Sequence, residues 1–172
     1  MSEASAERRA VTVEGVRLRF AAAHMATLGD ELEPLHGHNY IVRCRVEGAL
    51  TDDHWVIDFS ALKRFVREAC GRLDHRFLLQ RDSELLEIEE LAGAWAVRFG
   101  DREYRFPAAD VVVLPIENST AELLAQWLCE TVLEALAGGG HHNLTRIAVE
   151  VEEMPGQSGS YERTLPAGSL EG

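Results

Sequence analysis

The chain of 172 residues has little positive charge, because 17 Lys and Arg residues stand against 29 Asp and Glu residues and give a net charge of −12. Nucleic-acid backbones and anionic membranes are bound mainly through basic patches, so neither is expected as a partner. No hydrophobic run approaches the ~20 residues of a membrane span. The sequence therefore favours a small-molecule partner.

Cysteine is also scarce. Cys44, Cys70 and Cys129 are scattered along the chain, and no two of them have the CxxC spacing of a redox or zinc pair. The first ten residues contain no apolar signal core. These features fit a reducing compartment and predict a cytoplasmic protein.

Histidine is present where strand geometry would let three side chains bind one ion. His36 and His38 are two residues apart, so on a strand both project from one side, roughly 6.5 to 7 Å apart at the backbone. Apolar residues alternate with arginine from Val16 to His24, which puts His24 at the inward end of the preceding strand. Each histidine alone would be an ordinary strand residue, but together they predict a metal site. Three neutral imidazoles leave the fourth position of a tetrahedral zinc ion open, as in catalytic sites.

Two further segments alternate in the same way and predict strands. Alternation resumes from His38 to Glu47 after a polar loop at 25–35, and a last clear strand covers 146–153. The parity of this last strand directs Glu153 towards the core side. An acid is therefore expected near the inward face of the sheet.

Capping signals predict two helices. Asp58 is expected to cap a helix that ends near Asp74, and the segment 119–122, STAE, has the capping-box form that begins a second helix. The second helix is expected to stop at the glycine run 138–140. The order of elements lacks βαβ alternation, which indicates an α+β fold with an antiparallel sheet and helices on one face.

The length predicts a single domain at 11–165, between flexible tails at 1–10 and 166–172. Residues 84–113 are expected to form an inserted β-hairpin of extra strands, with a turn at Gly100-Asp101. The insertion could be a surface decoration or an oligomer contact.

Six short stretches carry the most specific motifs. They are FAAAH at 20–24, LHGHNY at 35–40, VIDF at 56–59, LDH at 73–75, STAE at 119–122 and the segment 153–161. In order and spacing they resemble the 6-pyruvoyl-tetrahydropterin synthase and 6-carboxy-tetrahydropterin synthase family. The resemblance covers nearly the whole chain except the insertion and the tails.

This resemblance implies a T-fold, in which subunits associate through their sheets to close a barrel without exposed edges. It implies a homo-oligomer, a trimer or hexamer, with a pterin bound at each subunit junction. His24, His36 and His38 match the family's Zn²⁺ ligands. Glu153 matches the carboxylate that anchors the pterin, and a carboxylate accepting two parallel N–H bonds suits an aminopyrimidinone edge.

Other residues match the family's site but also have structural interpretations. Asp74 and His75 match an acid and a histidine that work with the catalytic base, and an imidazole can exchange protons at neutral pH. Without the resemblance they would be a helix C-cap pair. Thr120 and Glu122 match substrate-binding positions, although the capping box already accounts for both.

The chain departs from the family at the catalytic cysteine. The position four residues before His36 is Leu32, which cannot remove a proton. Glu33, three residues before His36, resembles a variant branch in which glutamate replaces the cysteine. That branch cleaves the side chain of dihydroneopterin or its triphosphate to 6-hydroxymethyl-dihydropterin, a folate precursor. Glu31 is the alternative acid, and both could be ordinary loop residues.

Three functions therefore remain open. The first is a zinc-dependent lyase acting on dihydroneopterin triphosphate or a related pterin, with Glu33 as the base. The second is a 6-pyruvoyl- or 6-carboxy-tetrahydropterin synthase, the latter on the route to deazapurines such as queuosine. The third is a noncatalytic pterin or purine binder. An unrelated zinc hydrolase fits the residues less well.

Overall fold

One long strand with strict alternation organises the sheet. The computed structural model describes residues 8–166, and in it β5 (His36–Gly48) buries Tyr40 and the apolar residues at every second position after it. Along one edge of β5, β2 (Arg19–His24) pairs with the first half and β1 (Arg9–Val13) with the second half, both antiparallel. β11 (Leu144–Met154) pairs with the opposite edge. β5 is therefore the strand around which the sheet is assembled.

The remaining elements follow in chain order. They are β3 (Thr27–Leu28), β4 (Glu31–Leu32), α1 (Phe59–Leu73), β6 (Arg76–Gln80), β7 (Glu87–Leu91), β8 (Ala94–Phe99), β9 (Arg102–Pro107), the 3-10 helix η1 (Ala108–Asp110), β10 (Val111–Leu114), α2 (Ala121–Gly138) and β12 (Gln157–Thr164).

The main sheet has the strand order β10-β6-β2-β5-β11-β12, with β1 also paired to β5. Most pairs are antiparallel, but β6 is parallel to both β2 and β10. The expected antiparallel sheet is confirmed for most pairs, and the parallel pairing of β6 at this edge is an addition that the sequence did not indicate. The parallel β2–β6 pair arises because β5 and α1 connect the two strands and return the chain to the same end of the sheet.

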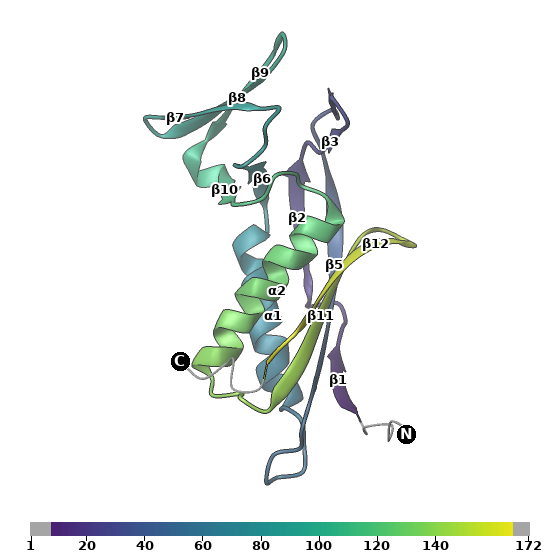
Figure 1. Ribbon diagram of the computed structural model, residues 1–172. Coiled ribbons are helices and arrows are strands. Elements are labelled where there is room, and N and C mark those ends of the chain that lie inside the picture. The colour runs from purple at the N-terminus through teal and green to yellow at the C-terminus, as the bar shows by residue number, and fades with distance from the viewer. Residues whose placement is uncertain (1–7, 167–172) are drawn as a thin grey trace.

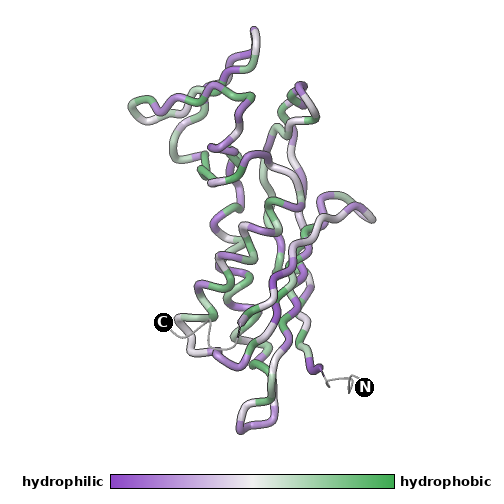
Figure 2. The backbone as a smooth tube through the Cα atoms, in the orientation of Figure 1, coloured by the Kyte–Doolittle hydropathy of each residue, from purple (hydrophilic) through white to green (hydrophobic). Residues whose placement is uncertain are grey.

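Both helices pack on the same face of the sheet, as expected for the α+β class (Figure 1). Asp58 caps α1 by accepting from the backbone N–H groups of Ser60 and Ala61, as predicted. The cap of α2 is Thr120, one residue later than the capping box suggested. Along the tube in Figure 2, hydrophobic and hydrophilic residues alternate in the helices and long strands. The hydrophobic faces meet in one core between the helices and the sheet.

The insertion is a three-stranded antiparallel sheet, β7-β8-β9, at the end of the molecule where β3 also lies (Figure 1). The predicted turn at Gly100-Asp101 joins β8 to β9. Residues 111–113, expected within the insertion, belong to β10 in the main sheet. A second hydrophobic core lies beneath the insertion and includes Met25, Leu32 and Phe77.

Several boundaries differ from the sequence expectation. Val16 is 80% exposed, because Gly15 to Leu18 form a turn and the strand begins only at Arg19. The loop at 25–35 contains the short hairpin β3–β4. β1 was not predicted, and it takes up two residues of the expected N-terminal tail. Residues 1–7 and 167–172 lie outside the described residues.

Within residues 8–166, no helix is long and apolar enough to cross a membrane.

Candidate metal centre and its cleft

The three histidines come together at the paired ends of β2 and β5. His24 lies directly opposite His36 in the β2–β5 register, and His38 lies opposite Ala22 on the same face. One ring nitrogen from each histidine lies within 4.8 Å of the others. The structure therefore forms the cluster that strand parity predicted.

Hydrogen bonds orient two of the rings. Nδ1 of His24 lies 3.0 Å from the backbone oxygen of Ser119, and Nδ1 of His36 lies 2.8 Å from that of Pro34. Because a carbonyl oxygen only accepts, each Nδ1 carries the hydrogen, and the neutral form of each ring then has its lone pair on Nε2. Burial lowers the pKa of His24, which keeps this ring neutral. Neutral rings fixed through the distal nitrogen are the form in which histidine binds metals.

The spacing of these nitrogens suits a small divalent ion. Zinc–nitrogen bonds of about 2.0 to 2.1 Å at tetrahedral angles place two ligand nitrogens roughly 3.3 Å apart. The Nε2 atoms of His24 and His36 are 3.2 Å apart. The donor set therefore fits a metal ion bound by three imidazoles.

Glu153, near the end of β11, places its side chain next to the histidine cluster. Its Oε1 atom is 3.4 Å from Nε2 of His24 and 3.6 Å from Nε2 of His38. The Tyr40 hydroxyl donates to the same oxygen over 3.3 Å. Burial and this carboxylate raise the pKa of Tyr40, so the phenol stays protonated as a donor. The inward parity predicted for Glu153 is thus found in the structure.

The Glu33 side chain lies beside another histidine of the cluster, His36. Its Oε2 atom is 4.0 Å from Nε2 of His36. Leu32, four residues before His36, is only 5% exposed and packs into the second core. Glu31 is exposed on β4. The buried leucine thus alternates with two acids, of which Glu33 is the one found beside the histidines.

None of the cysteines offers a thiol to this cleft. Cys44, Cys70 and Cys129 are buried in the main core. Burial raises the pKa of Cys70 and Cys129 to about 12 and also raises the pKa of Cys44, so all three stay as thiols at neutral pH.

The cluster opens into a cleft of about 450 Å³ that also contains the other expected substrate-binding residues. Thr120, at the start of α2, and Glu122, in its first turn, line the cleft together with Glu33 and Glu153. Among the described residues 8–166, no Lys or Arg lines the cleft. It presents carboxylates and a helix N-terminus to a bound molecule.

Asp74 and His75 are not part of this cleft. Asp74 accepts from the backbone N–H of Ala21 over 2.8 Å and lies 2.9 Å from Nδ1 of His75. His75 has a φ of 57°, which only a small minority of non-glycine residues adopt, and its N–H donates to the Ala21 oxygen over 2.6 Å. Both residues of this pair are bonded to the backbone of Ala21 in β2. Ala21 has the opposite strand parity to Ala22 and His24.

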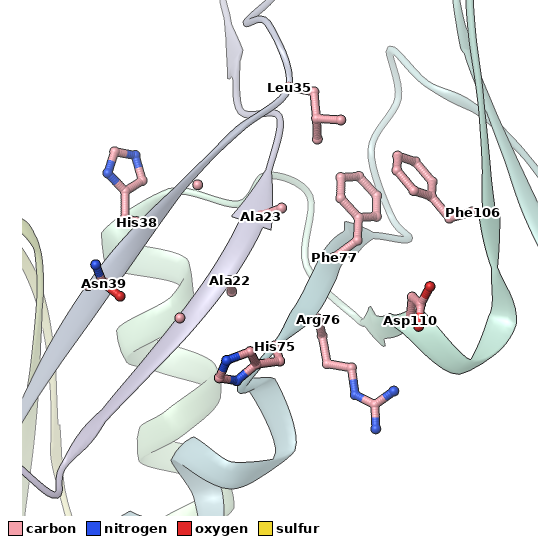
Figure 3. Close-up of a pocket in the computed structure, with 12 residues that line it drawn as sticks. Ala22, Ala23, Leu35, His38, Asn39, His75, Arg76, Phe77, Phe106 and Asp110 are labelled. Atoms are coloured by element: carbon pink, nitrogen blue, oxygen red, sulfur yellow. The ribbon is translucent and has the colours of Figure 1, made fainter.

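His75 consequently lies in a second groove, whose lining also includes His38 of the cluster. Figure 3 shows that groove, with the β2 ribbon passing between the rings of His75 and His38. Phe77 and Phe106 form its apolar wall, and Arg76 and Asp110 its polar rim. Within one chain, His75 therefore does not line the cleft that contains Glu33 and Glu153.

Sequence reasoning missed several residues that support the cluster. Tyr40 has the same parity as His36 and His38 on β5, and that parity is a signal that could have identified it. Ser119 holds His24, and its own N–H donates to the side chains of Gln80 and Asn118, each over 2.9 Å. No sequence signal identifies the role of Gln80, because it depends on the contact between β6 and the start of α2.

The chain is similar in sequence to known proteins. Residues 15–164 match the family model described as 6-pyruvoyl tetrahydropterin synthase. The chain is 32% identical over 149 residues to the putative 6-carboxy-5,6,7,8-tetrahydropterin synthase of Methanocaldococcus jannaschii, covering 86% of this chain and 91% of that protein. It is 40% identical over 62 residues to the dihydroneopterin monophosphate aldolase of Pyrococcus furiosus, covering 36% of this chain and 53% of that protein.

A solved structure is also similar along nearly the whole chain. The 6-pyruvoyltetrahydropterin synthase of Plasmodium vivax, in a variant whose catalytic glutamate is replaced by alanine, superposes with a TM-score of 0.87 at 33% identity. The superposition covers 92% of this chain and 99% of that chain. The similarity confirms the expected T-fold.

Proposed function

The chain belongs to the 6-pyruvoyl tetrahydropterin synthase family, and from that premise we propose that it is a zinc-dependent lyase with Glu33 as its catalytic base. Its substrate is 7,8-dihydroneopterin triphosphate or a related pterin, and its product is 6-hydroxymethyl-dihydropterin. His24, His36 and His38 hold the zinc ion. The pterin ring binds to Glu153, with Thr120 and Glu122 lining the same cleft.

One observation carries this proposal. The Glu33 carboxylate lies 4.0 Å from Nε2 of His36, while Leu32 is turned into the core. A carboxylate in that place can accept a proton from a ligand that reaches the metal centre. The variant of the Plasmodium vivax relative, described as lacking a catalytic glutamate, supports the assignment of an acid as the base.

The reaction is a retro-aldol cleavage of the pterin side chain. Glu33 accepts the proton of the 2′ hydroxyl, and the O–H electron pair forms the carbonyl of the leaving aldehyde. The bond between C1′ and C2′ breaks, and its electrons pass to C1′ and the adjacent C=N bond of the pterin. His75 donates a proton to C1′, which completes 6-hydroxymethyl-dihydropterin. Zinc, when bound, supplies a Lewis acid that stabilises negative charge on the side-chain oxygens.

Glu153 is suited to orient the pterin. The Tyr40 hydroxyl donates to Oε1 and holds the carboxylate in place, so N–H groups of an aminopyrimidinone can donate to it. Asp74 fixes the His75 ring at Nδ1, which leaves Nε2 to give or take a proton.

A complete site requires a second copy of the chain. His75 lines a groove that shares His38 with the cleft but does not include Glu33 or Glu153, so we expect it to reach the substrate when the groove of one subunit lies against the cleft of another. We therefore propose a homo-oligomer, a trimer or hexamer, with each site at a subunit junction.

Incubation of the zinc-loaded protein with 7,8-dihydroneopterin and its mono- and triphosphates tests this function. Chromatography with mass detection is expected to reveal 6-hydroxymethyl-dihydropterin together with a two-carbon aldehyde or its phosphate. Absence of any new pterin with all three substrates would overturn the proposal.

The similarity to putative 6-carboxy-tetrahydropterin synthases supports a second candidate. In that case the triphosphate would yield a carboxylated tetrahydropterin, which has a different mass. The same product measurement separates the two candidates.

A further inference from the structure

The peptide unit that precedes Glu33 is held at both of its polar ends. Its N–H, which belongs to Glu33, donates to the Ala26 oxygen over 2.9 Å. Its carbonyl, which belongs to Leu32, accepts from Nη2 of Arg102 over 2.8 Å. Because a peptide unit is planar, bonding both ends fixes its rotation and so restrains the backbone from which the Glu33 side chain extends.

Arg102 comes from a distant part of the chain. It is the first residue of β9 in the insertion, 70 positions along the sequence from Leu32. Its guanidinium carbon lies 5.1 Å from the centre of the Phe99 ring across the turn, a cation–π contact that holds the side chain in place. The hydrogen bond is partly buried, which shields it from competition with water.

The strand that carries Arg102 is itself attached to the main sheet. Phe106 of β9 stacks on Phe77 of β6 with ring centres 4.0 Å apart and an interplanar angle of 13°. The two rings lie beside each other in Figure 3. Leu32 packs into the same core. The insertion therefore has a rigid position relative to the turn that carries Glu33.

The opposite side of this turn has a different anchor. Asn118, just before α2, accepts from the Thr27 N–H over 2.9 Å and donates to the Thr27 oxygen over 2.8 Å. These bonds hold the start of the turn, six residues before Glu33. Arg102, in contrast, bonds directly to the carbonyl of the Leu32–Glu33 peptide.

We propose that Arg102 is a positioning residue that holds the Glu33 carboxylate beside the histidine cluster by clamping the Leu32–Glu33 peptide. The insertion thus orients the catalytic base from outside the cleft. This inference rests on the proposed function for its effect on turnover, whereas its effect on the turn does not depend on any activity.

Two variants of Arg102 and one control distinguish the effect of its hydrogen bond to Leu32 from the effect of its side-chain packing. Arg102→Met keeps the length of the side chain but has no donor, and Arg102→Lys keeps a donor. Arg105→Met is the control, because Arg105 lies on the same strand with its side chain exposed. Hydrogen exchange of the Glu33 amide is measured on the metal-free proteins, and kcat and KM on the zinc-loaded ones.

In Arg102→Met, the hydrogen-exchange rate of the Glu33 amide is expected to rise about tenfold, because one hydrogen bond from a charged donor is lost. The exchange rates of amides in α1 and β11 should not change. kcat is expected to fall about tenfold or more with KM within about twofold, because the base is displaced while the pterin anchor is intact. Arg102→Lys should recover most of both losses. Arg105→Met should match the wild type.

Unchanged Glu33 exchange and unchanged kcat in Arg102→Met would overturn the clamp. So would a rise in KM with constant kcat, or a Lys variant that behaves like the Met variant. If Arg102→Met does not fold, Arg102→Gln takes its place, because it keeps a polar group but is too short to reach the Leu32 oxygen. A wild type without pterin activity would contradict the proposed function, and the exchange measurement would still decide the clamp.

Discussion

Oε2 of Glu33 lies 4.0 Å from Nε2 of His36, three residues further along the chain. Glu33 lies in the turn after β4, and His36 is the first residue of β5. The neighbouring Leu32 is buried in the core, and this anchors the turn close to β5. A proton acceptor and a metal-ligating ring therefore face the same cleft. This relationship is the basis of the first prediction.

Glu33→Gln should lower kcat by about 10²-fold to 10⁴-fold, because the amide has nearly the same shape but cannot accept the substrate proton. The zinc content should not change, since Glu33 is not one of the three histidine ligands. Glu31→Gln is the matched control and should stay within about twofold of the wild type. Equal activity of Glu33→Gln and the wild type in a steady-state assay would exclude Glu33 as the base.

Mixing two inactive variants should restore activity if the site is shared between subunits. In the proposed site, Glu33 comes from one subunit and His75 from its neighbour. Glu33→Gln and His75→Ala therefore remove different contributions, and a mixed oligomer has some junctions in which both native residues are present. After joint unfolding and reassembly at equal amounts, about one quarter of the junctions should carry both native residues and turn over substrate. Activity no higher than that of the separate variants would mean that both residues act within one chain.

Gly159→Ala should destabilise the fold and disturb the cleft. A methyl group at Gly159 of β12 would lie 2.5 Å from the backbone nitrogen of Glu122 and 2.7 Å from the carbonyl carbon of Ala121. The start of α2 must then shift, at a cost of about 1 to 3 kcal/mol in the free energy of unfolding. Urea unfolding measures this change.

Gly71→Ala provides the control for that experiment. Gly71 is within α1, and an added methyl group there meets nothing within 4 Å. Alanine should stabilise the helix by about 0.4 to 1 kcal/mol. A neutral effect at Gly159 would show that β12 does not hold the start of α2 as closely as the structure indicates.

Asp74 should make the free energy of unfolding depend on pH in the acidic range. The Ala21 N–H and then the His75 ring hold the pKa of Asp74 below its usual value. A lowered pKa adds stability above the unfolded-state pKa, and that stability is lost as pH falls through the folded-state pKa. The stability difference between wild type and Asp74→Asn should therefore be constant above about pH 5 and shrink below about pH 4. Urea unfolding from pH 3 to 7 measures it, and a difference independent of pH would contradict the paired carboxylate.

Local patterns in the sequence were sufficient for the parts of the structure that depend on neighbours in the chain. Asp58 was identified as the cap of α1 because capping is a matter of three or four residues. His36 and His38 were placed on one face because strand parity is local. His24 required only the additional assumption that its strand pairs with theirs.

Relationships between distant segments were not predictable in the same way. The position of His75 outside the cleft follows from the parallel pairing of β2 with β6, and a single sequence contains no signal for that pairing. The bond from Arg102 to Leu32 joins segments 70 residues apart, and nothing in the motif around either residue points to the other. β1 was missed because its arginine and threonine conceal a short alternation of buried valines.

The metal content of the purified protein tests the central claim most directly. Elemental analysis should find about one zinc ion per chain in the wild type, and His36→Ala should lose it because two imidazoles bind zinc far more weakly than three. His54→Ala, which removes an exposed histidine, should retain the full content. A wild-type protein that contains no transition metal and takes none up when zinc is added would contradict the account.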